Sequence, residues 1–88
     1  MTYVYILACH DNSLYTGWTT NLAERLAAHQ AGQGARYTRA RLPVQLIYYE
    51  TLPDRQSAMK REVAIKRLPR VEKLALIARH QPDVNDRF

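Results

Sequence analysis

The stretch from Tyr15 to His29, YTGWTTNLAERLAAH, changes its hydrophobic period from that of a strand to that of a helix. Residues 15–19 suit a short strand around a glycine, and residues 22–29 suit a helix. At about 100° per residue, Arg25 and His29 share an arc with the two leucines of that helix. Burying an unpaired charge is costly, so charges normally lie opposite the apolar face. The pattern predicts either a polar site or two side chains whose stems lie along the core while their heads reach the rim.

The charge of the chain favours a polyanionic partner such as DNA. Thirteen Lys and Arg residues oppose eight acids, which gives a net charge of +5 and a pI near 9.7. The length of 88 residues predicts a single domain over residues 1–80 and a flexible C-terminal tail over residues 81–88. Cys9 is the only cysteine, which excludes an intramolecular disulfide and a multi-cysteine zinc site. No apolar run approaches the length of a membrane span, so we expect a cytoplasmic protein without membrane contact.

The first strand carries apolar or aromatic residues on both of its faces. Residues 3–8 alternate two such sets, which predicts a strand that is covered on both sides. Turn-forming residues follow at positions 10–13, and Leu14 to Thr19 is expected to return as the second strand of a hairpin. In such a hairpin, Tyr5 and Tyr15 approach the same edge.

The later elements follow from cap and turn signals. Asn21, with Glu24 three residues later, resembles a capping box, and Gly32 marks the end of that helix. Residues 44–50 are expected to form a third strand. Asp54 is the expected N-cap of a second helix that runs to residue 66 or 67, and Pro69 is expected as the first position of a last helix to about residue 80.

A basic segment, GQGARYTRARLP, lies between the first helix and the third strand. It is expected to be a loop, and it contains no acid. Such arginines suit phosphate contact, and a tyrosine among them suits stacking on a base or sugar. The alternative is a solvated loop that is merely basic. The residues concerned are Arg36, Tyr37, Arg39 and Arg41.

The second helix repeats the anomaly of the first. Glu62 falls inside its apolar arc, between Ala58 and Met59, whereas Lys60 and Arg61 fall on other faces, as solvated charges do. One interpretation is an ion pair with a core-facing cation. The other is a ligand for a divalent cation, because Mg²⁺ often takes one or two carboxylates together with phosphate and water.

These residues, taken in order, resemble the GIY-YIG nuclease superfamily. The matching elements are Tyr3-Val4-Tyr5, Tyr15-Thr16-Gly17, Arg25 with His29, and Glu62 followed by Lys66. Within the superfamily, the chain is similar to the small stand-alone YhbQ-like (UPF0213) group, from residue 3 to about residue 77. Two positions depart from the motifs: Tyr3 replaces a glycine and Thr16 replaces an isoleucine.

The resemblance implies an α/β (α+β) fold of β-β-α-β-α order, with helices on both faces of a three-stranded antiparallel sheet and a further C-terminal helix. It implies Mg²⁺- or Mn²⁺-dependent cleavage of DNA phosphodiesters, in repair or recombination. By position, Tyr5 and Tyr15 are the motif tyrosines, Arg25 faces the phosphate and Glu62 holds the metal. His29 matches a histidine found in several branches. The residues expected to contact DNA are Gly17, Arg36, Tyr37, Arg39, Arg41 and Lys66.

Two roles stay open at this stage. The general base is either Tyr15 or His29, and histidine is chemically the easier base because its reference pKa is about 6.5 against about 10 for tyrosine. Gly17 either allows a close approach beside Tyr15 or is a simple turn glycine.

The alternative function is a nucleic-acid-binding module that has little or no activity and needs a protein partner for specificity. A third reading is a basic protein-interaction domain without a role on nucleic acid. The expected state is a monomer or weak dimer.

Overall fold

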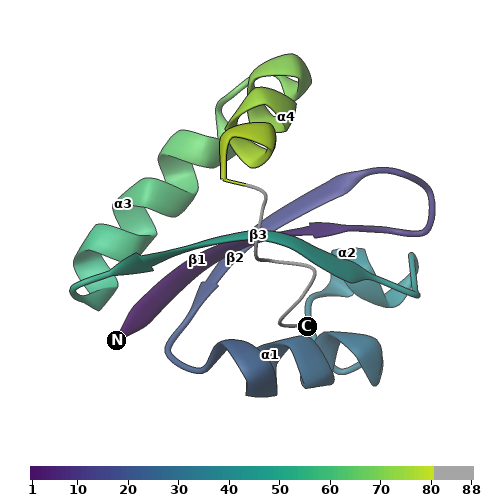
Figure 1. Cartoon of the computed structure of the whole chain (residues 1–88). Coiled ribbons are helices and arrows are strands. Elements are labelled where there is room, and N and C mark those ends of the chain that lie inside the picture. Colours follow the sequence, from purple (N-terminus) through teal and green to yellow (C-terminus); the bar gives the residue numbers. More distant parts are fainter. Residues whose placement is uncertain (81–88) are drawn as a thin grey trace.

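The computed structural model describes residues 1–80. The expected flexible tail, residues 81–88, lies outside this part. One antiparallel sheet has the strand order β2-β1-β3 and confirms the predicted α+β fold (Figure 1). Its strands are β1 (Thr2–Ala8), β2 (Leu14–Thr19) and β3 (Gln45–Leu52).

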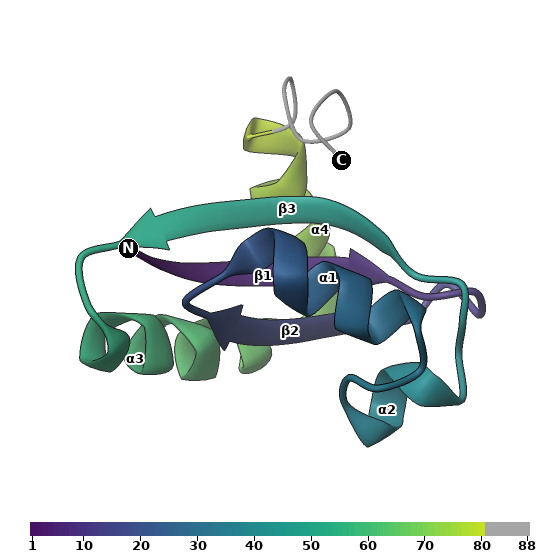
Figure 2. The ribbon, with the colours of Figure 1, turned by 90° about the horizontal axis from the view of Figure 1, so that it is seen from below.

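Helices cover both faces of the sheet. Figure 1 places α3 and α4 above the sheet and α1 and α2 below it, and Figure 2 shows α1 lying across the lower face. Among residues 1–80, no helix is long and apolar enough to cross a membrane. The helices are α1 (Leu22–Gln30), α2 (Arg36–Arg39), α3 (Arg55–Lys66) and α4 (Arg70–Arg79).

The central strand β1 is buried on both faces, as its sequence predicted. Val4 and Ile6 pack into one apolar cluster with residues of α3 and α4. Tyr5 and Leu7 pack into a second cluster, on the α1 side. Each cluster therefore fixes its helices to one face of the same strand.

The hairpin register brings the two motif tyrosines together. Tyr5 pairs with Gly17 and Leu7 pairs with Tyr15 across β1 and β2. Side chains of directly paired residues share a face, so Tyr5 and Tyr15 are diagonal neighbours on the α1 side. The prediction that they approach the same edge is confirmed.

The predicted caps of two helices are confirmed. The side chain of Asn21 accepts a hydrogen bond from the Glu24 amide at 3.0 Å, which is one of the two bonds of a capping box. The Asn21 amide donates to the hydroxyl of Thr19 instead of to the Glu24 side chain. The α1 helix ends before Gly32, whose φ of 77° lies in the left-handed region. The Asp54 carboxylate accepts from the Ser57 amide at 2.7 Å at the start of α3.

Three predicted boundaries are corrected. The basic segment is not a loop throughout, because α2 forms one helical turn around the buried Thr38. The third strand begins at Gln45 and ends at Leu52, later than predicted. Pro69 is the N-cap of α4 rather than its first helical residue.

The predicted apolar arc of α3 is too wide. Its buried residues are Ala58 and Ile65, whereas Met59 is 51% exposed and its apolar neighbour Val63 is 45% exposed. Arg61, predicted to be solvated, donates two 2.8 Å hydrogen bonds to the half-buried carboxylate of Glu50. A carboxylate on the covered face of β3 needs a cation, and Arg61 supplies it.

Candidate active site

Three aromatic rings from separate elements meet on the α1 side of the sheet. Tyr5 comes from β1, Tyr15 from β2 and His29 from the last turn of α1. The His29 ring centroid lies 5.8 Å from that of Tyr5 and 5.4 Å from that of Tyr15, both edge to face. The structure therefore brings together three of the four residues predicted to be catalytic, and the fourth, Arg25, lies one turn before His29.

The His29 ring is fully buried, and both of its nitrogens are hydrogen-bonded. Nδ1 lies 2.7 Å from the hydroxyl of Thr38, and Nε2 lies 2.9 Å from the hydroxyl of Tyr5. The Thr38 hydroxyl donates its single proton to the carbonyl of Ala35, so it accepts from His29. Nδ1 therefore carries the proton, and Nε2 accepts the proton of the Tyr5 hydroxyl.

This arrangement fixes His29 as a neutral side chain inside the protein. Burial, and then the nearby charge of Arg25, lower the pKa of His29 below its ordinary value. The lone pair on Nε2 is directed at Tyr5. Although histidine is chemically the easier base, His29 is therefore not placed to take a proton directly from solvent water.

Arg25 interacts with both motif tyrosines. Its interaction with Tyr5, and more weakly with Tyr15, raises the pKa of Arg25, which keeps the guanidinium charged. The side chain is half-buried. Burial raises the pKa of Tyr5 to about 12, although the hydrogen bond with Arg25 opposes this rise. The apolar arc of α1 thus places a cation at a cluster of hydroxyl groups, where a phosphate oxygen could be bound.

Glu62 joins this cluster from the opposite face of the sheet. Its carboxylate is close enough to Tyr5 for its charge to contribute to the raised pKa of that hydroxyl. The Glu62 side chain is 19% exposed, and its Oε2 lies 3.6 Å from the Nζ of Lys66. Glu62 therefore forms an ion pair, although its partner is the exposed Lys66 rather than a core-facing cation, and its role as a metal ligand stays a prediction.

Gly17 explains how Tyr5 reaches the outer strand. A Cβ atom built on Gly17 would lie 2.6 Å from the Tyr5 hydroxyl oxygen and 2.8 Å from Cζ. The Tyr5 ring therefore crosses β2 where β2 has no side chain. Of the two interpretations of Gly17, the structure supports the close approach, with a tyrosine as the approaching group.

Two residues that hold His29 were not predicted. A Cβ on Gly34 would lie 2.7 Å from Cγ and 2.8 Å from Cε1 of the His29 ring. Thr38 binds the same ring from α2. Both lie in the segment predicted to be a loop, where no periodicity assigns an inward direction. The two closely spaced glycines, Gly32 and Gly34, are the one signal in the sequence for a close approach here. They do not indicate that His29 is the side chain that approaches.

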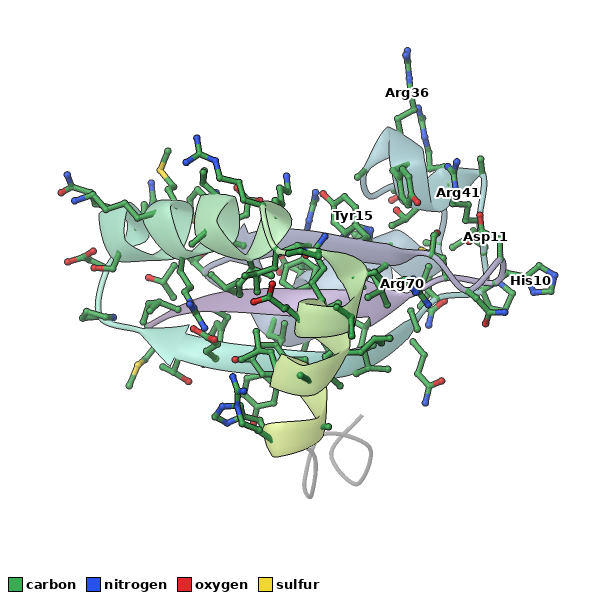
Figure 3. All side chains as sticks on the ribbon, turned by 90° about the horizontal axis from the view of Figure 1, so that it is seen from above. His10, Asp11, Tyr15, Arg36, Arg41 and Arg70 are labelled. Atoms are coloured by element: carbon green, nitrogen blue, oxygen red, sulfur yellow. The ribbon has the colours of Figure 1, made fainter. Side chains whose placement is uncertain are left out.

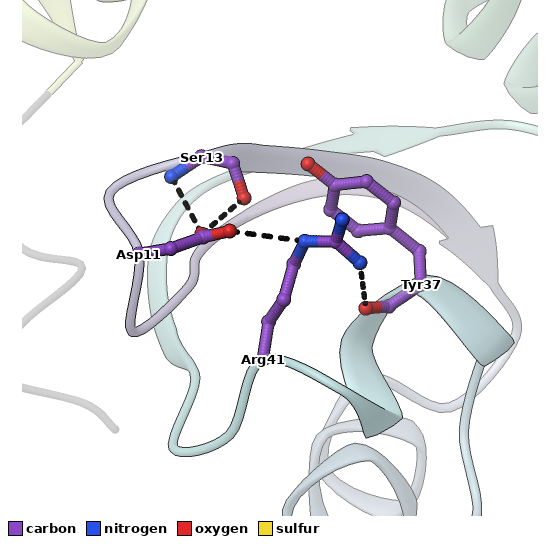
Figure 4. Close-up of polar contacts among 4 residues, drawn as sticks. All are labelled: Asp11, Ser13, Tyr37 and Arg41. Carbon is purple, nitrogen blue, oxygen red and sulfur yellow. Dashed lines mark hydrogen bonds and ion pairs between the residues drawn. The ribbon is translucent and has the colours of Figure 1, made fainter.

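The basic residues around α2 divide into two kinds. Arg36 and Arg39 are exposed, and Arg36 points away from the sheet (Figure 3). Arg41 is engaged within the protein, because it donates to the Asp11 carboxylate at 3.0 Å and to the carbonyl of Tyr37 at 2.9 Å (Figure 4). The segment itself contains no acid, but Asp11 of the β1–β2 hairpin supplies a carboxylate to it.

Tyr37 supports Tyr15 through a ring contact. The two rings stack with centroids 6.0 Å apart and an interplanar angle of 25°. The Arg41 guanidinium covers the Tyr37 ring at 3.8 Å from its centroid. A nucleobase could stack on that covered face only by displacing Arg41.

The side chains at this site offer few ligands for a divalent cation. Within residues 1–80 there is no group of three or more His, Cys, Asp or Glu side chains that could hold a metal ion. Glu62 is a single, partly exposed carboxylate beside the cluster. Mg²⁺ commonly binds proteins through one or two carboxylates and completes its shell with water and substrate phosphate. The residues present therefore fit a site that the substrate completes, and they do not fit a cage made of protein alone.

Comparison with known proteins identifies relatives along most of the chain. A family model described as the GIY-YIG catalytic domain matches residues 1–74. A UPF0213 protein of Streptococcus pyogenes serotype M5 is 54% identical over 82 residues, covering 92% of this chain and 89% of that protein. A UPF0213 protein of Clostridium perfringens is 55% identical over 78 residues, covering 89% and 84%.

Two solution NMR structures share the fold at 40% sequence identity. The UPF0213 protein BH0048 from Bacillus halodurans gives a TM-score of 0.61, covering 94% of this chain and 89% of that chain. The protein EF2693 from E. faecalis gives a TM-score of 0.56, with 84% and 80% covered.

Proposed function

The chain belongs to the GIY-YIG family, and from this premise we propose that it is a metal-dependent endonuclease that hydrolyses DNA phosphodiesters. The observation that carries the proposal is the meeting of the Tyr5, Tyr15 and His29 rings, with Arg25 interacting with both tyrosines. The charge of Glu62, on α3, also acts on the Tyr5 hydroxyl, so a cation and a carboxylate from two further elements influence the same group. A cytoplasmic role in DNA repair or recombination, with a protein partner that supplies specificity, is the setting we propose.

Each side chain has a chemical task in this reaction. Arg25 binds the phosphate with its planar fork and offsets the charge that develops on the phosphate oxygens. Glu62 would hold Mg²⁺ or Mn²⁺, which as a Lewis acid supplies further charge stabilisation and lowers the pKa of bound water. The ion pair with Lys66 keeps the carboxylate compensated when no metal is bound.

We assign Tyr15, as the phenolate left once its own hydroxyl proton has passed to solvent, to accept the proton of the attacking water. Tyr15 is half-buried and lines an open pocket, whereas Tyr5 is 2% exposed and His29 is fully buried. Tyr5 and His29 instead hold each other and Arg25 in position. Positioned proton transfer contributes on the order of 10²–10⁴-fold to rate, so Tyr15→Phe is expected to lower the cleavage rate by that amount.

A nuclease assay with Mg²⁺ or Mn²⁺ on duplex, single-stranded, flapped and branched DNA tests the proposal. We expect the wild type to cleave at least one of these substrates and to stop when the metal is chelated. Glu62→Gln and Arg25→Ala should abolish cleavage while thermal unfolding stays cooperative. Lys60→Gln, on the exposed face of α3, is the matched control and should cleave normally.

The same assay separates the alternative functions. DNA binding without cleavage, unchanged in Glu62→Gln, would support a binding module that lacks activity. Arg36→Gln combined with Arg39→Gln removes two exposed charges without disturbing the engaged Arg41. If this double variant and the wild type both fail to bind DNA, the proposal is wrong and the protein-interaction reading gains.

A further inference from the structure

A pocket with a volume of about 280 Å³ lies at the outer edge of the sheet, beside the candidate active site. Strand β2 is an edge strand, so its outer side presents backbone groups without a neighbouring strand. Figure 3 shows Tyr15 between the C-terminal end of α3 and α2, where this edge is open. The lining residues come from β2, α2, α3 and α4: Leu14, Tyr15, Thr16, Tyr37, Lys66 and Lys73.

The pocket adjoins the active site but is a separate space. Tyr15 lines it and also interacts with Arg25, and Lys66 lines it and also pairs with Glu62. Arg25 and Glu62 themselves do not line it. A group bound in the pocket would therefore neighbour the reacting phosphate without replacing it.

The charge of the lining points to an anion. Two lysines line the pocket and no carboxylate does. Lys73 is half-buried on α4, and Lys66 is 51% exposed at the end of α3. Because two cations that line one pocket repel each other, the pair is stabilised when an anion lies between them. The lysine ammonium is a compact charge that suits a phosphate oxygen.

Thr16 provides an independent observation. It lines the pocket and is 3% exposed, yet its hydroxyl is the one buried side-chain polar atom among residues 1–80 that lacks a hydrogen-bond partner. Buried polar groups in native proteins are almost always paired, and an orphan is a reason to look for a missing partner.

We infer that this pocket binds a phosphate group of the DNA strand next to the phosphodiester that is cleaved, with Lys66 and Lys73 sharing that one phosphate. The inference rests on the proposed function for the identity of the polyanion. The Thr16 hydroxyl is buried in the free protein, so it reaches the bound phosphate or its sugar once its side chain rotates toward the pocket. Tyr37, covered by Arg41, forms a wall of the pocket rather than a stacking platform for a base.

The test is the salt dependence of binding of a short, fluorescently labelled single-stranded DNA, measured by anisotropy in chelator so that no cleavage occurs. Each phosphate contact contributes about 0.7 to the slope of log K against log salt for single strands. One shared phosphate predicts that Lys66→Gln with Lys73→Gln lowers the slope by about 0.7, whereas two separate phosphates would lower it by about 1.4. Thr16→Val should weaken binding several-fold at every salt concentration and leave the slope unchanged, because the hydroxyl is uncharged.

The matched control removes the same charge from outside the pocket. Lys60→Gln with Arg79→Gln alters two exposed cations, neither of which lines the pocket, and should leave the slope close to that of the wild type. A slope for the pocket variant equal to that of this control would overturn the inference, as would a drop of about 1.4.

The outcomes also distinguish the inference from the function on which it rests. A slope reduced by one contact in a protein that never cleaves DNA with added metal supports the phosphate pocket and refutes the nuclease. Cleavage by the wild type with an unchanged slope in the pocket variant refutes the pocket alone. A wild type that does not bind DNA refutes both.

Discussion

Gly34→Ala is expected to disrupt the support of His29 although it adds a single methyl group. The new Cβ would lie 2.7 Å from Cγ and 2.8 Å from Cε1 of the His29 ring, and closer still to Nδ1. Separations below about 3.0 Å are not tolerated, so either the ring or the backbone must move. The ring cannot move freely, because it is fully buried and tied to Tyr5 and Thr38.

The expected cost follows from two contributions. Overpacking of a filled site costs about 1–3 kcal/mol. A shifted ring also loses its hydrogen bond to Thr38, worth about 1 kcal/mol net. The free energy of unfolding should therefore fall by about 2–4 kcal/mol, which lowers the Tm by roughly 8 °C or more in a domain of this size.

Urea denaturation of a double-mutant cycle tests the cause. His29→Ala removes the ring that the new methyl group would strike, so Gly34→Ala should cost at least about 1 kcal/mol less in that background. Gly32→Ala is the control, because it is strained by its φ of 77° but its Cβ would make only an ordinary van der Waals contact, 3.8 Å from Cδ1 of Leu42, and it should be additive with His29→Ala. Additive costs for Gly34→Ala and His29→Ala would refute the steric reasoning.

Two further predictions concern stability. Thr16→Val removes a buried hydroxyl that has no hydrogen-bond partner, so the free energy of unfolding of the free protein, measured by thermal unfolding, should rise by about 1 kcal/mol. A destabilised variant would show that the hydroxyl is paired in the free protein. Because the pKa of His29 is lowered in the folded state, the unfolded chain binds more protons below about pH 6.5, and stability should fall as pH decreases through that value. The fall should be shallower in His29→Gln, as measured by Tm against pH.

The sequence predicted best where a residue is constrained by its own element. Arg25 and His29 were located by helical periodicity alone, and the turn between β1 and β2 aligned Tyr5 with Tyr15. Asn21 and Asp54 carry local cap signals, which the structure confirms. Such predictions hold because the relevant geometry spans only a few residues along the chain.

Contacts between distant segments were not predictable in the same way. Asp11 and Arg41 lie far apart in sequence and pair only because the hairpin and α2 reach the same edge. Arg61 was predicted to be solvated, because the carboxylate of Glu50 that turns it inward lies on β3. Lys73 joins the pocket only through the packing of α4. In each case the partner lies on another element, so periodicity within one element cannot identify it.

The two motif tyrosines have different environments, and this difference assigns their roles. Tyr5 is 2% exposed, donates to a buried histidine and has a pKa raised to about 12, so ionising it would break the contacts that hold it. Tyr15 packs against His29 and Tyr37 on its ring faces and edges while bordering an open pocket. A rigid ring beside open space is suited to contact a substrate, and a ring locked in the core is suited to position others. We therefore propose that proton transfer at this site is carried by Tyr15, and that the hydrogen-bonded series Tyr5, His29 and Thr38 holds Arg25 and Tyr15 in position.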